Sequence, residues 1–254
     1  MPRRAPELLS GALPLALLLG VWQTVTASGA APASLLPPPS AVFFRLAERA
    51  SDAAYLQHVA TTLLRLSGGF VIAAALGVLA GAAAGSSRLI AVLITPVVRV
   101  LAPVPKIALY PALILVLGFE HASKIALVAA DAMFPVLLAT YQGTRAVDER
   151  LIWSARAAGT SRARALYKVV LPAALPAVLT GCRIGLVISA IVVFLAEMIT
   201  STDGLGHLLI YAARSLHTID MFVPLITMAI LGLILNAAFN ALCARLLAPY
   251  PLGA

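Results

Sequence analysis

Residues 66–87 read LSGGFVIAAALGVLAGAAAGSS and contain no charged side chain. A helix that crosses a lipid bilayer needs about 20 mainly apolar residues, because it rises 1.5 Å per residue through roughly 30 Å of hydrocarbon. Residues 221–244, MFVPLITMAILGLILNAAFNALCA, meet the same condition. These two runs predict helices that span a membrane.

The composition of the whole chain supports this prediction. The 254 residues are 61% hydrophobic and 11% charged, whereas soluble domains carry roughly 25% charged residues. A membrane β-barrel would need alternating apolar and polar residues, and the runs here are continuously apolar. The expected fold class is therefore an all-α integral membrane protein.

We expect about six transmembrane helices, one at the N-terminus and five in a core. The other four runs follow Arg3 and Arg4 or are interrupted by single charges, and cover about 8–25, 89–118, 122–141 and 176–200. We divide the chain into an N-terminal helix with an external proline-containing segment, residues 1–65, and the core, residues 66–254. The N-terminal run also has the features of a cleavable signal peptide, and that alternative stays open.

The distribution of positive charge predicts the orientation. Six of the 18 Lys and Arg residues lie between 142 and 175, and basic residues gather in cytoplasmic loops. This places residues 142–175 and both termini inside, and residues 26–65 and 201–220 outside. The same clustering explains the net charge of +8 without nucleic-acid binding. The two cysteines lie in apolar runs and the four histidines lack metal-ligand spacing, so we expect no metal site.

The basic internal loop contains SARAAGTSRARALYKVVLPAALPAV at residues 154–178. Residues 150–158 suit a short helix, and Gly159 suits the left-handed position just past its end. Thr160 or Ser161 can cap a second short helix, which Leu171-Pro172 should end, because the residue before a proline is driven away from helical geometry. A basic loop that rests on anionic lipid would have a similar composition.

The spacing of Gly159, Val169, Leu171 and Pro172 resembles the EAA…G…I.LP signature of binding-protein-dependent ABC importer permeases. In that family the segment forms coupling helices between spans 4 and 5 that dock on a separate ATPase. Trp153 replaces the glutamate of the signature. The resemblance implies a segment at about 150–172 with ATPase-coupling roles for Ser154, Ala155, Gly159, Arg162, Val169, Leu171 and Pro172.

Three other stretches resemble the nitrate, sulfonate and taurine subgroup of this family. They are LLPPPSAV at 35–42, PVPKIALYPALILVLGF at 103–119 and LAEMITSTDGLGHLLIYAA at 195–213. The resemblance implies a bacterial inner-membrane permease that pairs with a second copy, an ATPase that binds ATP and Mg, and an external solute-binding protein. It also implies that Asp203, Gly204 and Gly206 meet the binding protein. The implied solute is a small anion such as a sulfonate, taurine or nitrate, although some members take neutral heterocycles.

Four ionisable residues fall within the predicted spans and are candidates for the translocation path: Lys106, Asp131, Arg183 and Glu197. Each costs about 2.5–3.5 kcal/mol at the centre of a membrane helix, so each needs a partner or a water-filled path. The two carboxylates either line an outward path or pair with a basic residue. Arg183 suits the inner interface, and Lys106 suits an interface or a cavity.

Two further alternatives are considered. A stand-alone secondary transporter with a basic cytoplasmic loop would show two similar halves, and no such repeat is visible. A membrane-embedded enzyme would cluster His, Asp or Cys residues near one interface, and the sequence shows no such cluster.

Gly77 and Gly81 form a small-residue pair that suits helix packing either within this chain or between two copies. The phosphate-binding motif G-x-x-x-x-G-K-[ST] does not occur, so ATP hydrolysis is expected from a partner.

Overall fold

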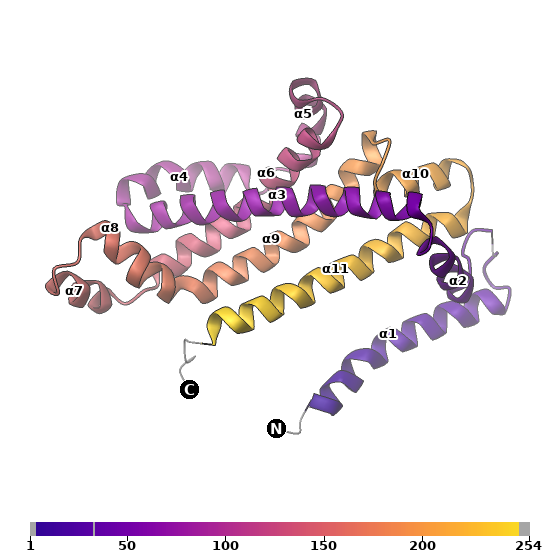
Figure 1. The fold of residues 1–254 in the computed structure, drawn as a ribbon, viewed down its shortest axis with the longest axis horizontal. Helices are drawn as coiled ribbons and strands as arrows, with labels where there is room; N and C mark the ends of the chain where they lie inside the picture. Colours follow the sequence, from indigo (N-terminus) through magenta and orange to yellow (C-terminus); the bar gives the residue numbers. More distant parts are fainter. Residues whose placement is uncertain (1–3, 33, 249–254) are drawn as a thin grey trace.

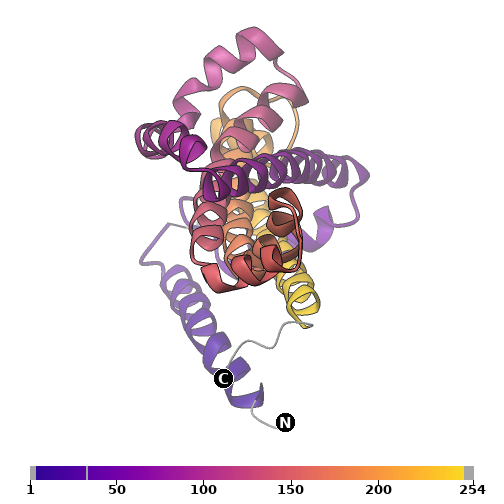
Figure 2. The same cartoon turned by 90° about the vertical axis from the view of Figure 1, so that its left-hand side faces the viewer.

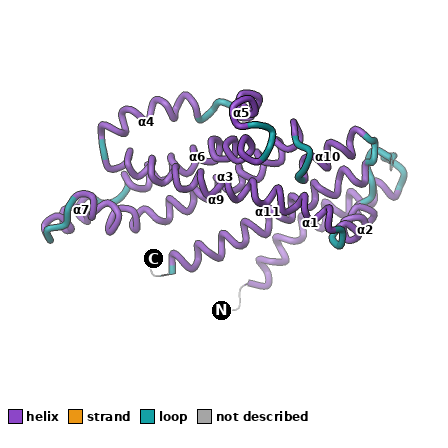
Figure 3. The backbone as a smooth tube through the Cα atoms, turned by 45° about the horizontal axis from the view of Figure 1, so that its top comes forward, coloured by secondary structure: helices purple, strands orange, loops and turns teal. Residues whose placement is uncertain are grey.

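The computed structural model describes residues 4–32 and 34–248, which are helix and loop throughout (Figure 3). The fold is therefore all-α, as predicted. In chain order the helices are α1 (Arg4–Ala27), α2 (Pro39–Arg49), α3 (Ala53–Ser86), α4 (Arg88–Leu101), the 3₁₀ turn η1 (Lys106–Leu109), α5 (Tyr110–Leu117), α6 (His121–Arg145), α7 (Glu149–Ala157), α8 (Arg162–Ala165), the π turn η2 (Leu166–Val170), α9 (Leu171–Thr200), α10 (Leu205–Arg214) and α11 (Thr218–Leu247).

The long helices lie side by side and the short ones cap the two ends. Helix α6 lies between α3 and α9 and packs extensively against both, and α11 packs against α9 and α10. Helices α7 and α8 lie at one end of the molecule, whereas α2 and α10 lie at the other (Figure 1). Most of helix α1 stands away from this bundle (Figure 2), and Trp22 near its end contacts Phe222 of α11. The end with α7 and α8 is called the inner end below, and the end with α2 and α10 the outer end, after the sides predicted from charge.

Four helices are long and apolar enough to cross a membrane: α3, α6, the continuous helix Arg162–Thr200 and α11. The pair α4 and η1–α5 makes a fifth span if counted as one, although it is bent by 87°. The N-terminal residues Leu13–Ala27 form a shorter apolar helix. The described helices thus support four or five spans by length and composition, and the sixth, at the N-terminus, stays a prediction.

The span predicted over 89–118 is bent where α4 gives way to η1 and α5. Pro103 and Pro105 have no N–H to donate, so the hydrogen-bond ladder of α4 stops at Leu101. The ammonium group of Lys106 donates to the freed carbonyl of Ala102 at 2.7 Å. The side chain of Lys106 therefore completes the end of α4 where the backbone turns away.

Glycines spaced four residues apart bring α3 against α6. A Cβ on Gly77 would lie 2.8 Å from the Cβ of Val136, and one on Gly81 would lie 2.6 Å from the carbonyl oxygen of Leu137. No side chain fits at such distances, so the helix backbones touch directly. The small-residue pair predicted from sequence therefore packs within the chain and not between two copies. Gly181 makes the equivalent approach of α9 to α6, with a Cβ 2.6 Å from that of Ala139.

Replacing Gly77 with alanine should destabilise the bundle. The new methyl group would force α3 and α6 apart or displace Val136, and overpacking of this kind costs about 1–3 kcal/mol. Gly232→Ala in α11 is the matched control, because a Cβ there meets nothing within 4 Å. The measurement is the apparent melting temperature of each detergent-solubilised variant. Equal melting temperatures for the two variants would contradict this account of the α3–α6 contact.

Candidate functional site

Helix α7 ends in the left-handed turn that the sequence predicts. Gly159 has φ +79°, and its N–H donates to the carbonyl of Arg156 at 2.9 Å. The N–H of Thr160 donates to the carbonyl of Ala155 at 3.1 Å, which completes a Schellman motif. Of the two predicted caps for the next helix, Ser161 is the one used, and its hydroxyl accepts a hydrogen bond from the N–H of Arg164 at 3.4 Å.

The predicted end of the second helix at Leu171-Pro172 is wrong. Helices α8 and α9 run on through η2 as one helix, Arg162–Thr200. The π turn η2 lies immediately before Pro172 and widens the helix where the proline ring would otherwise meet the carbonyl of the preceding turn. Pro172 itself occupies the first turn of α9. We call α7, the Gly159 turn and the first residues of the long helix, up to Pro172, the inner unit. It is thus one short helix followed by the start of a long one.

The inner unit presents apolar and basic side chains to its surroundings. Helix α7 buries none of its residues, and Trp153 and Tyr167 are 62% and 56% exposed. Ser154 is exposed, whereas Ala155, Val169, Leu171 and Pro172 are half-buried. Arg162 is exposed, and its guanidinium donates to the carbonyl of Ser86 at the end of α3, at 2.9 Å. Arg162 therefore fastens the inner unit to α3.

A cluster of polar groups lies at the outer end, and we call it the outer cluster: the buried residues Thr62, Arg65, Glu197 and Gly206, with the exposed His121 and the partly exposed Asp203 at its edge. At its centre the Arg65 side chain is 2% exposed and pairs with Glu197, which is 0% exposed, at 2.9 Å. The same guanidinium contacts a carboxylate oxygen of Asp203 at 2.6 Å and donates to Nδ1 of His121 at 3.1 Å. One arginine of α3 thus binds the ends of α9 and α6 and the loop before α10.

Glu197 is the other centre of the outer cluster. Its carboxylate accepts hydrogen bonds from the Thr62 hydroxyl at 2.9 Å and the N–H of Gly206 at 3.1 Å. The Thr62 oxygen in turn accepts from the N–H of Leu205 at 2.8 Å. Of the two alternatives for Glu197, the ion pair is the one observed.

The sequence does not point to Arg65, because this residue falls just before the uncharged run, in the predicted external segment. The signal that points to it is the unpartnered Glu197 in the fifth predicted span, which requires a buried basic residue on a neighbouring helix. Sequence alone does not identify which one.

Asp203 lies in the loop between α9 and α10, and its side chain is 40% exposed. Partial burial raises the pKa of this carboxyl, but the hydrogen bond and positive charge of Arg65 outweigh it, and the net pKa is below the ordinary value. Asp203 is therefore ionised at neutral pH. Its contact with Arg65 persists until the pH falls through that lowered pKa.

Gly204 and Gly206 are buried, which corrects the expectation that they form an external contact surface. A Cβ on Gly204 would collide with the carboxylate of Glu197, and one on Gly206 with the carbonyl of Phe194. The N–H of Gly204 donates to Nδ1 of His58 at 2.9 Å. These glycines allow the loop to close over the outer cluster, and Thr202 is its exposed residue.

The four intramembrane candidates are not brought together. Lys106 pairs with Asp131 at 3.1 Å, and its ammonium lies 4.4 Å from the ring centre of Phe134. Arg183 donates to the side-chain oxygen of Asn240 on α11. Arg183 also borders an apolar groove of about 850 Å³ between α9 and α11. Among these candidates the structure thus shows one ion pair, Lys106–Asp131, and two residues with partners elsewhere.

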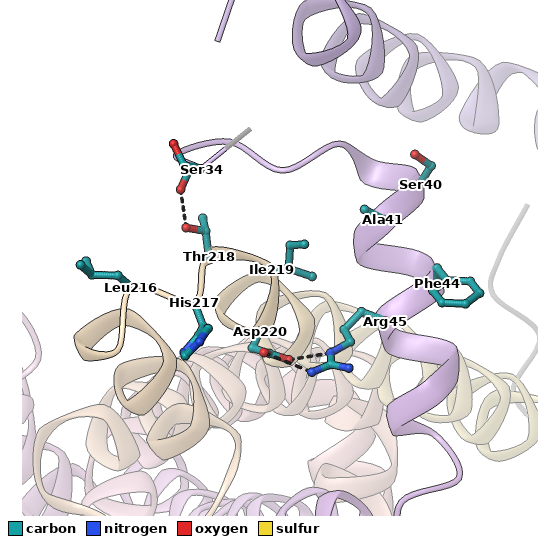
Figure 4. Close-up of a pocket in the computed structure, with 10 residues that line it drawn as sticks. All are labelled: Ser34, Ser40, Ala41, Phe44, Arg45, Leu216, His217, Thr218, Ile219 and Asp220. Atoms are coloured by element: carbon teal, nitrogen blue, oxygen red, sulfur yellow. Dashed lines mark hydrogen bonds and ion pairs between the residues drawn. The ribbon is translucent and has the colours of Figure 1, made fainter. Parts of the chain in front are cut away.

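A second groove, of about 700 Å³, opens at the outer end between α2 and the start of α11 (Figure 4). Arg45 on α2 spans it and pairs with Asp220 at 2.9 Å. On its rim Leu216 is 87% exposed and has φ +58°, a conformation that is costly for a residue with a side chain. The groove is apart from the outer cluster and involves none of the predicted site residues.

A family model described as the binding-protein-dependent transport system inner membrane component matches residues 73–248. The chain belongs to this family. It is thus a transmembrane permease subunit of an ABC importer, and the matched region includes the outer ends of α6 and α9 and the whole inner unit.

Named relatives resemble this permease over nearly its full length. The aliphatic sulfonates transport permease protein SsuC of Bacillus subtilis is 32% identical over 94% of this chain and 87% of its own. The taurine transport system permease protein TauC of Escherichia coli is 34% identical over 91% of this chain and 86% of its own. A solved structure of the MetNI methionine ABC transporter has a TM-score of 0.62 at 18% identity, over 77% of this chain and 99% of that chain. The last similarity shows the shared fold.

Substitution of Gly204 should damage this permease more than the same substitution at Gly118. Both glycines adopt an extended left-handed backbone, with φ +95° and ψ 169° at Gly204 and φ +83° and ψ 177° at Gly118. The backbone strain on alanine, about 1–3 kcal/mol, is therefore shared. Only at Gly204 would the methyl group also strike Glu197, because Gly118 has open space around it.

The measurement is the yield and melting temperature of both alanine variants in detergent. We expect Gly118→Ala to be purified with a lowered melting temperature and Gly204→Ala to be largely lost. Similar behaviour of the two would show that the outer cluster tolerates the displacement of Glu197.

Proposed function

We propose that this permease forms, with a second copy of itself, the path for a small organic anion of the sulfonate or taurine class. Transport through this path is driven by a separate ATPase that docks on the inner unit. The solute is delivered by an external binding protein. The observation that carries the proposal is the inner unit itself, in which α7 is held away from the bundle by the Gly159 turn with its side chains uncovered.

The chemistry of the inner unit suits a protein partner. Exposed Trp153 and Tyr167 offer large apolar contact areas of the kind that dominate protein interfaces. Arg156, Arg164 and Lys168 are exposed around them and can meet acidic groups of the partner. ATP and Mg are assigned to that partner, because this chain carries no phosphate-binding motif. Ser154, Ala155 and Gly159 are the residues to which we assign coupling most directly.

The remaining assignments follow from the same arrangement. The inner end, with α7 and the basic loop, is placed on the cytoplasmic side of a bacterial inner membrane, and the N-terminus with it. The core from residue 66 onward forms the transport unit, and residues 1–65 form an accessory helix and external segment. On the outer face Thr202 and Asp203 are the exposed positions of the α9–α10 loop at which a binding protein would make contact. Lys106 and Asp131 remain candidates for the path.

The solute class is proposed from the named relatives. SsuC and TauC carry sulfonates and taurine in their names, and both cover more than nine-tenths of this chain. In proteoliposomes that contain the complete importer, we expect uptake of radiolabelled taurine to be competed by alkanesulfonates and not by a cationic amine of equal size. Competition by the amine alone would contradict the proposed anion class.

Replacement of Gly159 with valine should weaken ATPase docking without preventing membrane insertion. A β-branched residue is strained at φ +79°, so the turn would change conformation and move α7. Gly29→Val is the matched control, because Gly29 has φ +75° and open space in the loop that follows α1. The measurement is the amount of ATPase that co-purifies with each tagged permease from detergent-solubilised native membranes, identified by mass spectrometry.

We expect at least a fivefold loss of co-purified ATPase for Gly159→Val and little loss for Gly29→Val. Equal recovery of ATPase with both variants would contradict the assignment of the Gly159 turn to coupling. A permease that purifies with no ATPase at all, under conditions that preserve other importers, would contradict the proposed function as a whole.

A further inference from the structure

The outer cluster joins elements that lie far apart in the sequence through very few side chains. Arg65 of α3 contacts Glu197 near the end of α9, Asp203 in the following loop and His121 at the start of α6. Thr62, one turn earlier on α3, joins Glu197 to the backbone N–H of Leu205 at the start of α10. Any movement of the outer end of α9 away from α3 has to break these bonds together.

The inner unit and the outer cluster are the two ends of one helix. The helix Arg162–Thr200 has 39 residues, so it is about 58 Å long at 1.5 Å per residue. The Gly159 turn precedes its first residue, and Glu197 lies in its last turn. The π turn and Pro176 both lie close to the inner end, and from residue 177 to Thr200 the helix is α-helical without a further proline. A displacement imposed on the inner end is therefore carried to Glu197.

Buried charge suits a contact that has to open and close. A buried ion pair adds little stability over well-packed apolar side chains of similar size, so stability alone does not explain its presence. When the pair is separated at the outer end, water can solvate both charged groups. Separated apolar side chains would instead be exposed to water at a cost proportional to their area. The Arg65–Glu197 pair is thus a contact that can open without exposing apolar surface to water.

We propose that Arg65 and Glu197 are positioning residues that couple the ATPase to the outer opening of the permease: the pair is intact in the state described here and separates when the inner end of α9 is displaced. This inference rests on the proposed docking of an ATPase on the inner unit. In this proposal the outer cluster acts in transport by holding and releasing the ends of the helices, and not by binding the solute.

The test measures whether the outer cluster opens in response to ATP. Ser201, whose hydroxyl lies 3.3 Å from the Arg65 guanidinium, is replaced by cysteine in a chain with Cys182→Ser and Cys243→Ser. The complete importer in proteoliposomes is treated with a membrane-impermeant charged maleimide, without nucleotide or with ATP and vanadate. We expect labelling at least fivefold faster in one of these two states. Ser215→Cys, on the exposed loop before α11, is the control and should label equally in both.

The double variant Arg65→Met with Glu197→Leu removes the pair without leaving a lone buried charge. We expect it to retain ATP hydrolysis within about twofold, to lose the nucleotide response of Ser201→Cys, and to lose taurine uptake at least tenfold. Arg45→Met with Asp220→Leu is the matched control, because it removes an outer ion pair that joins α2 to α11 and does not involve α9. We expect the control to keep the nucleotide response.

Thr62→Val serves if the double variant does not assemble, since it removes one hydroxyl and no charge. We expect it to reduce the nucleotide response about threefold. Labelling of Ser201→Cys that is unchanged by nucleotide in the unaltered background, or full uptake by an assembled double variant, would overturn the inference. Loss of ATPase from the unaltered complex would instead overturn the proposed function, so the two failures are distinguishable.

Discussion

Direct contact between helix backbones is the constraint on which the rest of this permease depends. Gly77 and Gly81 of α3 and Gly181 of α9 all face α6 at distances that exclude any side chain. Because lipid is as apolar as leucine, helices in a membrane gain little from burying apolar surface and associate through such close packing. The central position of α6 follows, and with it the positions of α3 and α9 on either side. The charged groups at their outer ends meet only because these backbones are so close.

The sequence predicted the parts of the structure that depend on local chemistry. Uncharged runs predicted α3 and α11, and a glycine before a serine cap predicted the turn at Gly159. Both follow from properties of neighbouring residues. The prediction failed at Pro172, where a π turn accommodates the proline and the helix continues. At residues 89–118 the structure keeps an apolar segment of the predicted length but bends it by 87° at its paired prolines. Proline indicates that a helix is disturbed there, but not whether it ends, bends or widens.

The outer cluster could not be predicted from local patterns in the sequence. Arg65 and Glu197 are separated by 132 positions, and nothing local indicates that they meet. The predicted boundary at residue 65 placed Arg65 outside the core, whereas α3 begins at Ala53 and passes through that boundary without interruption. Gly204 and Gly206 were associated with an external surface because their loop was external. Their burial follows from the carboxylate beneath them, which only the folded chain reveals.

The bond between Arg162 and the carbonyl of Ser86 has a mechanical consequence. It ties α3 to the start of the long helix at the inner end, just as Arg65 ties α3 to the finish of that helix at the outer end. While both contacts are intact, α3 and the long helix cannot separate, and they move as one rigid body. The two contacts are unequal, because the Arg162 hydrogen bond is exposed to water, whereas Arg65 is buried and shared among several partners. We therefore expect a force applied to α7 to break the Arg162 contact first, after which the displacement passes along the long helix to the Arg65 contact at its other end.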